Sequence, residues 1–203
     1  DIRVRYQLAF SIGQALAPSR NSTLITLARK DIGNAWMRLA ILSSLSKGAD
    51  KVLSALATDG DFSSQPDGLA FLKDVCSQIG IRNRPHEIST VIGLMEKHTD
   101  LASPFLEALV SKVQGEQREQ LLAFTSGKTA DVLMKLVTSA VETAQNVELE
   151  PATRIHAIEN LQLAEFRQVS ELLDQLLDVR QPFEIKATAI DTLGEFTQQE
   201  VAL

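Results

Sequence analysis

The chain has 203 residues, of which 44% are hydrophobic and 23% charged, and its formal net charge at pH 7 is −6. This composition excludes a disordered protein. No apolar run approaches the ~20 residues of a transmembrane helix, so we expect no membrane insertion by this segment. Because aromatic residues make up 5% of the chain while leucine and alanine are abundant, the composition favours helices.

Apolar residues recur at helical spacing along the whole chain and predict about twelve helices. The predicted helices cover residues 2–16, 20–29, 34–46, 48–58, 66–80, 86–98, 102–113, 116–125, 128–146, 151–163, 166–178 and 182–197. Since the connections between them are short, successive helices are expected to pack as antiparallel hairpins. Residues 58–65 are polar and contain Gly60, and we expect them to form an exposed loop.

Prolines stand directly before several predicted helices, where the first turn tolerates a residue without a backbone N–H. These prolines are Pro66, Pro85, Pro104, Pro151 and Pro182. Ser103, which precedes Pro104, and Asn34 are candidate N-caps, because their side chains accept hydrogen bonds from the unpaired amides of a first turn.

One helix pattern recurs from end to end. It is clearest as Val4-Arg5-x-x-Leu8-Ala9-x-x-Ile12-Gly13 and as Ile185-Lys186-x-x-Ala189-Ile190-x-x-Leu193-Gly194, each with a glycine where the helix is expected to stop. A basic residue followed three and four places on by apolar residues occurs at Arg5, Arg38, Arg118, Arg154 and Lys186. Their spacings of 33, 80, 36 and 32 residues indicate a helix-pair repeat of about 30–50 residues.

This periodicity predicts an all-α fold. We expect a right-handed α-α superhelix, or solenoid, of about six HEAT- or armadillo-like helical hairpins, which form a single domain over residues 1–203. Each hairpin would leave an apolar face that only the next hairpin covers.

The recurring pattern resembles the second helix of a HEAT repeat. More narrowly, Asn34-x-Trp36-x-Arg38-x-Ala40-x-Leu42-Ser43-Ser44-Leu45 and Leu176-Leu177-Asp178-x-Arg180-Gln181-Pro182 resemble the HEAT-repeat region of planctomycete-type membrane-bound dehydrogenases. The resemblance implies a periplasmic protein in which a sugar-dehydrogenase-like β-propeller precedes the repeats and a c-type cytochrome domain follows them. Because Asp1 opens directly into the repeat pattern, we expect the chain to be a piece of a longer protein.

The chain lacks the motif that would attach haem in such proteins, Cys-x-x-Cys-His. Its only cysteine, Cys76, is followed by Ser77-Gln78-Ile79-Gly80. We therefore expect no cofactor and no catalytic residue in this segment. Cys76 lies in an apolar stripe at helical spacing, which predicts a buried, unreactive thiol.

The histidines do not predict a metal site. His86, His98 and His156 are far apart in sequence, whereas a metal ion needs three or four converging ligands. Glu87 adjoins His86, but successive residues of a helix point about 100° apart, so we expect the two not to chelate together. His98, near a helix end, is expected to interact with terminal carbonyl groups. The glycines show neither Walker nor dinucleotide-binding spacing, and no strand-to-helix elbow presents a nucleophile.

Two further features bear on partners. Trp36, the only tryptophan, is expected to pack between repeats, with an anchor in a binding interface as the alternative. Four of the recurring basic residues are expected to pair with carboxylates of neighbouring repeats, namely Arg5, Arg38, Arg154 and Lys186. Residues 126–203 carry six Lys/Arg against thirteen Asp/Glu, which argues against nucleic acid as the main partner.

The sequence therefore predicts a non-catalytic scaffold whose partner is a protein or a neighbouring domain of the same chain, and the resemblance implies that the scaffold belongs to a larger oxidoreductase. Two alternatives stay open. An enzyme built on helical repeats would require a deep pocket with perturbed titratable groups. A nucleic-acid-binding repeat protein would require clustered arginines and lysines along one surface.

Overall fold

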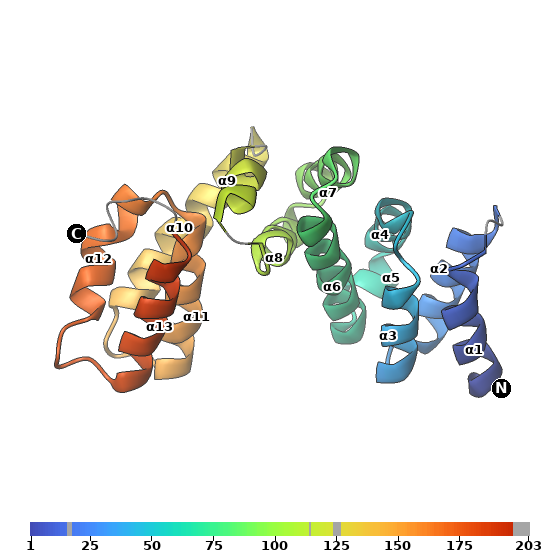
Figure 1. Ribbon diagram of the computed structural model, residues 1–203, viewed down its shortest axis with the longest axis horizontal. Coiled ribbons are helices and arrows are strands. Elements are labelled where there is room, and N and C mark those ends of the chain that lie inside the picture. The colour runs from blue at the N-terminus through green and yellow to red at the C-terminus, as the bar shows by residue number, and fades with distance from the viewer. Residues whose placement is uncertain (16–17, 114, 124–126, 197–203) are drawn as a thin grey trace. The chain divides into compact units, whose positions relative to one another are not determined.

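The computed structural model describes residues 1–15, 18–113, 115–123 and 127–196, and these residues form helices and turns with no β-strand (Figure 1). The helices are α1 (Ile2–Ile12), α2 (Arg20–Asp31), α3 (Ala35–Ser43), α4 (Ala49–Ala57), α5 (Gly60–Ser63), α6 (Pro66–Arg82), α7 (Pro85–Lys97), α8 (Thr99–Val110), α9 (Gly115–Ala123), α10 (Lys128–Gln145), α11 (Pro151–Asn160), the 3-10 turn η1 (Leu161–Leu163), α12 (Phe166–Leu176) and α13 (Phe183–Gly194). The all-α prediction is confirmed.

Each of the twelve predicted helices overlaps one observed helix, because the positions of apolar residues and caps decide where a helix forms. The predicted helix ends at residues 16, 125 and 197 lie outside the described residues. Asn34 is an N-cap as predicted, since its side chain accepts a 3.1 Å hydrogen bond from the backbone N–H of Met37. Pro66, Pro85 and Pro151 occupy first-turn positions, and Pro182 caps α13.

The prediction for Ser103 and Pro104 is wrong. Helix α8 begins at Thr99, so both residues lie inside it, and the hydroxyl of Ser103 donates to the carboxylate of Glu107 at 3.1 Å. The extra turn buries Leu101 and Ala102. This burial offsets the backbone hydrogen bond that a proline inside a helix cannot donate.

The prediction of an exposed loop at residues 58–65 is right only in part: most of the segment is exposed, but Gly60–Ser63 form the short helix α5 and Phe62 is buried. Asp59 caps the short helix α5 by accepting from the backbone N–H of Phe62, which turns the Phe62 side chain into the core. There its ring meets Phe71 edge to face, with 6.3 Å between centroids. Gly68 permits this packing, because a Cβ at residue 68 would lie 1.9 Å from the carbonyl oxygen of Phe62.

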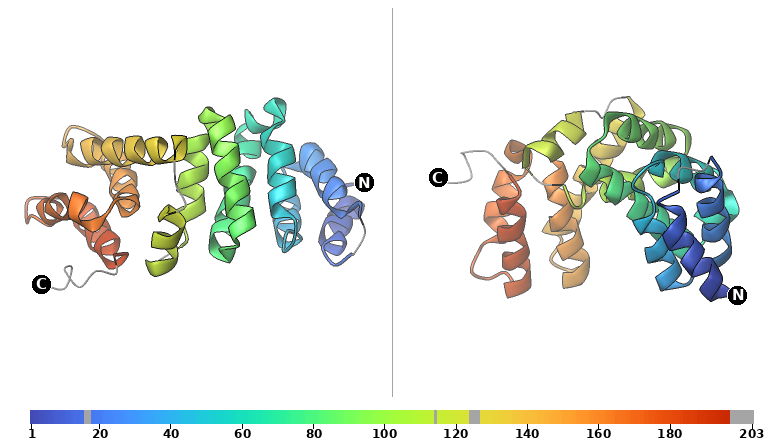
Figure 2. Two further views of the ribbon diagram at one scale, coloured as in Figure 1. Left: turned by 90° about the horizontal axis from the view of Figure 1, so that it is seen from above. Right: turned by 45° about the vertical axis from the view of Figure 1, so that its right-hand side comes forward.

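The chain divides into two compact units, Asp1–Lys112 and Val113–Leu203. One row of helices in the first unit consists of α1, α3, α6 and α8, and each helix of this row contacts the next (Figures 1 and 2). Helices α2, α4 and α7 form a second row that packs against the first. The space between the rows is filled by fully buried side chains, among them Leu24, Met37, Ile41, Leu53, Leu72 and Phe105. The expectation of one continuous domain stays a prediction.

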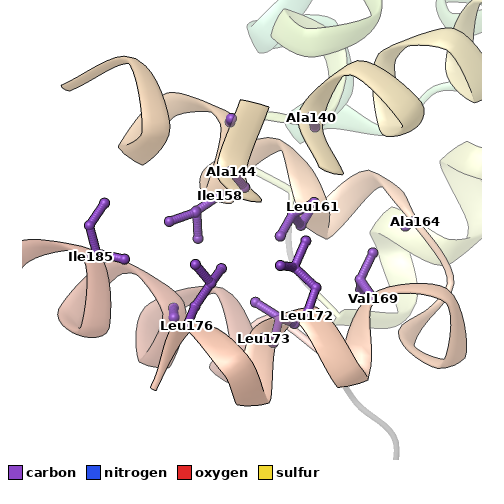
Figure 3. Close-up of a cluster of buried hydrophobic side chains, with 12 residues drawn as sticks. Ala140, Ala144, Ile158, Leu161, Ala164, Val169, Leu172, Leu173, Leu176 and Ile185 are labelled. Carbon is purple, nitrogen blue, oxygen red and sulfur yellow. The ribbon is translucent and has the colours of Figure 1, made fainter. Parts of the chain in front are cut away.

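In the second unit, α10 packs on α11, and α11 and α12 both pack on α13. Figure 3 shows their shared core, in which small residues of α10 face branched side chains of α11 and α12. The core includes Ala140, Ala144, Ile158, Leu161, Leu172, Leu173, Leu176 and Ile185. The alanines allow close approach of α10, and the leucines supply most of the apolar area removed from water.

A lateral hydrogen bond recurs between helices that lie side by side. The Ser44 hydroxyl, just after α3, donates to the carbonyl oxygen of Ala9 in α1 at 2.6 Å. The Arg82 guanidinium in α6 donates to the carbonyl just beyond α3, that of Leu45, also at 2.6 Å. In the second unit the Thr192 hydroxyl of α13 donates to the carbonyl of Ile158 in α11 at 3.3 Å. The donors and acceptors are 35, 37 and 34 residues apart.

Candidate functional site

A groove of about 480 Å³ lies between α1 and α3 and has a mainly apolar lining. Ile2 and Tyr6 of α1 form one side, and Trp36 and Met37 of α3 form the other. The indole of Trp36 is 69% exposed, an unusual state for the chain's only tryptophan. Arg3 is the charged residue in the lining.

The prediction that Trp36 packs between repeats is wrong. Helix α3 buries Met37, Ala40 and Ile41, and Trp36 and Leu39, to one side of this face, are both exposed. Both faces of α3 carry large apolar residues, so the sequence pattern did not tell the core face from the surface face. The exposure of Trp36 fits the alternative, an anchor for a partner.

The basic residues predicted to pair with carboxylates do so in part. Arg5 forms an ion pair with Asp31 at 2.5 Å, and Arg38 forms one with Asp67 at 2.9 Å. The hydrogen bond to Arg5 lowers the pKa of the Asp31 carboxyl below its ordinary value. A third pair of similar sequence separation joins Arg29 to Asp59 at 2.7 Å.

In the second unit the outcome differs among three basic residues. Arg118, which is buried, contacts Glu195 at 3.1 Å and Gln162 at 2.9 Å. Buried Arg154 instead donates to the carbonyl oxygen of Ala144 at 3.1 Å, and it also contacts the side chain of Gln181. Lys186 donates to a backbone carbonyl, that of Val179, and its charge also helps to lower the pKa of the Asp178 carboxyl. The carboxylate prediction is therefore wrong for Arg154, which donates to a backbone carbonyl at the end of α10.

Three potential metal ligands converge in the first unit, contrary to the geometric argument from the sequence. Ligand atoms of Asp50, His86 and Glu87 lie within 4.8 Å of one another. Glu87 is buried, and its carboxylate pairs with the guanidinium groups of Arg82 and Arg84, at 3.4 Å each. The sequence argument failed because it considered α7 alone, and Asp50 comes from α4.

The electrostatics of this cluster oppose a cation. Two guanidinium groups already neutralise Glu87, and the N-terminal end of α7 adds partial positive charge. Burial lowers the pKa of the Arg82 guanidinium, and the carboxylates of Glu87 and Asp50 oppose that shift. The arginines also donate to the carbonyls of Leu45 and Ser46, beyond the end of α3, so the cluster fastens α7 to α3.

The other two histidines lie apart from this cluster. His98 stands where α7 meets α8, and its backbone N–H donates to the carbonyl oxygen of Leu94 at 2.8 Å. His156 is exposed on α11, and its ring nitrogen lies 3.2 Å from the carboxylate of Glu159. Neither arrangement brings together three ligands among the described residues.

A polar groove of about 530 Å³ opens at the turn between α12 and α13, where the sequence resembles the dehydrogenase repeats. Asp178 accepts hydrogen bonds from the backbone N–H, Nε and Nη2 of Arg180, at 2.8 to 3.0 Å. The side-chain and backbone bonds from Arg180 lower the pKa of the Asp178 carboxyl to about 2. A carboxyl group with so low a pKa has no proton to donate at neutral pH and accepts one weakly, so it is a poor general acid and a poor general base, and the pair organises the turn.

A third groove, of about 560 Å³, runs along α10 and is mainly apolar. Leu133, Met134 and Val137 line one side, and Leu163 and Ala164 line the other. It offers no titratable group other than two glutamates at its margin, Glu142 and Glu165.

Cys76 is fully buried in α6, as the sequence predicted. Burial raises the pKa of its thiol well above the ordinary value. Because the thiolate is the nucleophile, this cysteine is held in its unreactive form.

Comparison of the chain with protein-family models, with curated proteins and with solved structures gives no match. Among the described residues, no helix combines the length and the hydropathy needed to cross a bilayer. The sequence resemblance described above therefore stays an expectation, and the site geometry carries the functional argument.

Proposed function

We propose that this chain is a non-catalytic scaffold made of HEAT-like helical hairpins stacked as a right-handed superhelix, and that it holds a protein partner in the groove between α1 and α3. The observation that carries the proposal is the exposed indole of Trp36 in an apolar groove. Exposed tryptophans that line a groove are frequent anchors of protein interfaces, because their burial removes a large apolar area from water.

The recurring lateral hydrogen bonds support the repeat architecture. In the pairs Ser44–Ala9 and Thr192–Ile158 the hydroxyl donor and carbonyl acceptor are 35 and 34 residues apart, in the first and second units respectively. A helix-pair repeat of about 30–50 residues produces equivalent contacts at such intervals. Stacked pairs of this kind present a continuous surface to a partner.

The groove favours a protein segment with apolar side chains and carboxylates. Tyr6 and Trp36 supply apolar surface, and Arg3 supplies a positive charge at the margin. A nucleic acid fits less well, because Arg5 and Arg38 are already neutralised by carboxylates and phosphate contacts would have to displace these. The polar groove at Asp178 does not support a catalytic function, because the carboxylate of Asp178 already accepts two hydrogen bonds from the guanidinium group of Arg180.

In a protein of the type that the sequence resembles, the partner would be a neighbouring domain of the same chain, an oxidoreductase module or a c-type cytochrome, in the periplasm. The scaffold would then hold the two redox domains at a constant separation. This extension of the proposal depends on the resemblance alone.

Selection from a random peptide library tests the groove directly. The immobilised chain should enrich peptides that combine aromatic or leucine residues with Asp or Glu. Trp36→Ala should weaken their binding at least about tenfold, because it removes the largest apolar contact. Val179→Ala, at another exposed apolar position, in the second unit, is the control and should leave binding unchanged. Enrichment of the same peptides on the Trp36→Ala protein, or no enrichment on either, would contradict the proposal.

A further inference from the structure

The polar groove at the turn between α12 and α13 belongs to the second unit, and its lining includes a buried cation that the proposed scaffold function does not use. We propose that this groove binds a small organic molecule through one carboxylate group, which pairs with the guanidinium group of Arg154. The apolar part of that molecule lies against Val147 and Pro182, which also line the groove.

Arg154 is buried without a counter-charge. Its side chain is 4% exposed, yet no carboxylate among the described residues lies within ion-pair distance of it. Its Nε donates to the carbonyl oxygen of Ala144 at 3.1 Å, and its Nη2 donates to the amide oxygen of Gln181 at 3.2 Å. Both acceptors are neutral groups that carry only partial charge. Because a buried charge is costly unless an opposite charge pairs with it, this site favours the entry of an anion.

The guanidinium group of Arg154 also has donors left for a ligand. A guanidinium group has five N–H donors, and the two hydrogen bonds of Arg154 use two of them. Its Nη1 has no acceptor in the part of the chain that the structure describes, and it is not sealed from solvent. Since Arg154 lines the groove, these donors are available to a molecule inside it. Hydrogen bonds from a guanidinium group to a carboxylate are stronger than those to neutral acceptors.

The carboxylate already present in the groove belongs to a different pair. Both oxygens of Asp178 accept hydrogen bonds from the Arg180 side chain, at 2.8 and 3.0 Å. These hydrogen bonds, together with the charges of Arg180 and Lys186, lower the pKa of the Asp178 carboxyl. The described lining carries two arginines and one aspartate, a net charge of +1. One arginine is therefore neutralised, and the charge of Arg154 remains.

The N-terminal end of helix α13 adds partial positive charge at the same groove. Pro182, which lines the groove, is the N-cap of this twelve-residue helix, and its side chain makes no capping hydrogen bond. The first amides of a helix without such a cap favour a nearby anion. Glu184 lies in the first turn, but it is exposed and does not line the groove.

The charge balance favours a carboxylate over a phosphate. A carboxylate brings one negative charge, which matches the net charge of the lining, whereas a phosphate group brings about −1.5 to −2 close to Asp178. The volume of about 530 Å³ is typical of sites for small molecules. Val147 is 66% exposed, so an apolar group of the ligand would cover surface that now faces water.

Titration of the full chain with benzoate, at constant ionic strength and followed by two-dimensional amide NMR, tests the inference. We expect saturable shifts of the amide signals around the groove, with a Kd of roughly 1–10 mM for so small a ligand. Benzyl alcohol, which has the same ring without the charge, should cause no such shifts. Inorganic phosphate should bind at least about tenfold more weakly than benzoate.

Three outcomes of this titration would contradict the proposal. The absence of saturable benzoate binding would exclude the site. Phosphate binding as tight as that of benzoate would exclude the preference for a carboxylate. Tighter binding of acetyl-tetra-alanine with a free carboxyl terminus, lost in its amide, would assign the groove to the end of a peptide instead of a small molecule.

Gln181→Glu is the decisive variant, because it keeps the shape of the side chain and places a carboxylate beside Arg154. The side-chain oxygen of residue 181 already lies 3.2 Å from Nη2 of Arg154. The new carboxylate should abolish benzoate binding and raise the Tm by about 2 °C or more, since it supplies the missing counter-charge. Gln14→Glu, at an exposed position in the first unit, is the matched control and should bind benzoate like the unmodified chain. Undiminished benzoate binding by Gln181→Glu, or a lowered Tm, would overturn the inference.

Discussion

The hydroxyl of Ser44 lies against Gly13, close enough that a Cβ at residue 13 would stand 2.6 Å from the Ser44 Oγ and 2.8 Å from its Cα. Gly13 has an ordinary helical backbone, with φ −59° and ψ −30°, so its conformation does not require glycine. Glycine is required instead by the close approach of Ser44 to α1, which brings the Ser44 hydroxyl to the carbonyl oxygen of Ala9.

Replacement of this glycine tests the close approach. Gly13→Ala is expected to lower the free energy of unfolding by about 1–3 kcal/mol, because the methyl group forces α1 away from α3. Gly93→Ala is the control, since a Cβ at residue 93 meets no atom within 4 Å. It should raise the free energy of unfolding by about 0.5–1 kcal/mol through helix propensity. Urea unfolding followed by circular dichroism measures both, and equal effects of the two substitutions would contradict the contact.

Substitution of Gly68 is expected to destabilise the protein more than substitution of Gly13, because the atom nearest to a Cβ at residue 68 belongs to the backbone. The carbonyl oxygen of Phe62 cannot rotate away as a side chain can. Gly68→Ala should therefore destabilise the protein by about 3 kcal/mol or more, by displacing α5 and exposing the Phe62 ring. Gly60→Ala, with no atom within 4 Å of the added Cβ, is the control in the same segment. A Gly68→Ala protein of normal stability would show that Phe62 does not pack as described.

The ion pair of Asp178 and Arg180 predicts a pH dependence. The folded-state pKa of about 2 lies below the ordinary unfolded value of about 3.9, so the pair stabilises the fold above the unfolded value. This contribution is lost as the pH falls through about 4 towards about 2. Carboxyl chemical shifts in an NMR titration should place the Asp178 pKa near 2, and Arg180→Ala should move it upward. A pKa unaffected by Arg180→Ala would refute the pairing.

Cys76 is expected to resist thiol reagents in the folded protein. Its side chain is fully buried, and burial raises the pKa of the thiol, so almost no thiolate is present at neutral pH. Ellman's reagent should react with less than about one-tenth of the thiol before unfolding, and with all of it in denaturant. Fast labelling of the native protein would contradict the packing of α6.

The cluster around Glu87 predicts stabilisation without a metal ion. Glu87→Gln should lower the free energy of unfolding by about 1–3 kcal/mol, less than the loss of a fully buried ion pair, because Arg84 is half-exposed. Addition of Zn²⁺ should leave the unfolding temperature of the unmodified protein unchanged, since the arginines occupy the carboxylate. A rise in that temperature with Zn²⁺, lost in His86→Ala, would instead establish a metal site.

The sequence predicted the candidate surfaces less well than it predicted the helices. Trp36 was expected inside the fold, yet its exposure provides the main candidate for a binding site. His86 and Glu87 were expected not to converge, and Asp50 from another helix brings a third ligand beside them. In each case the missing information was the position of a neighbouring helix, which spacing along one helix does not contain.

The sequence by itself determined the all-helical character and the approximate bounds of twelve helices, because apolar periodicity, prolines and caps act within a few residues of chain. It also determined that Cys76 would be buried, since its neighbours on the same stripe are all apolar. Only the tertiary structure decided which of two apolar faces α3 buries, why Gly13 and Gly68 must be glycine, and which acceptor each arginine reaches. These outcomes depend on how separate helices and turns pack against one another, as Gly13 does against Ser44 and Arg5 against Asp31, and such contacts exist only when the helices are packed.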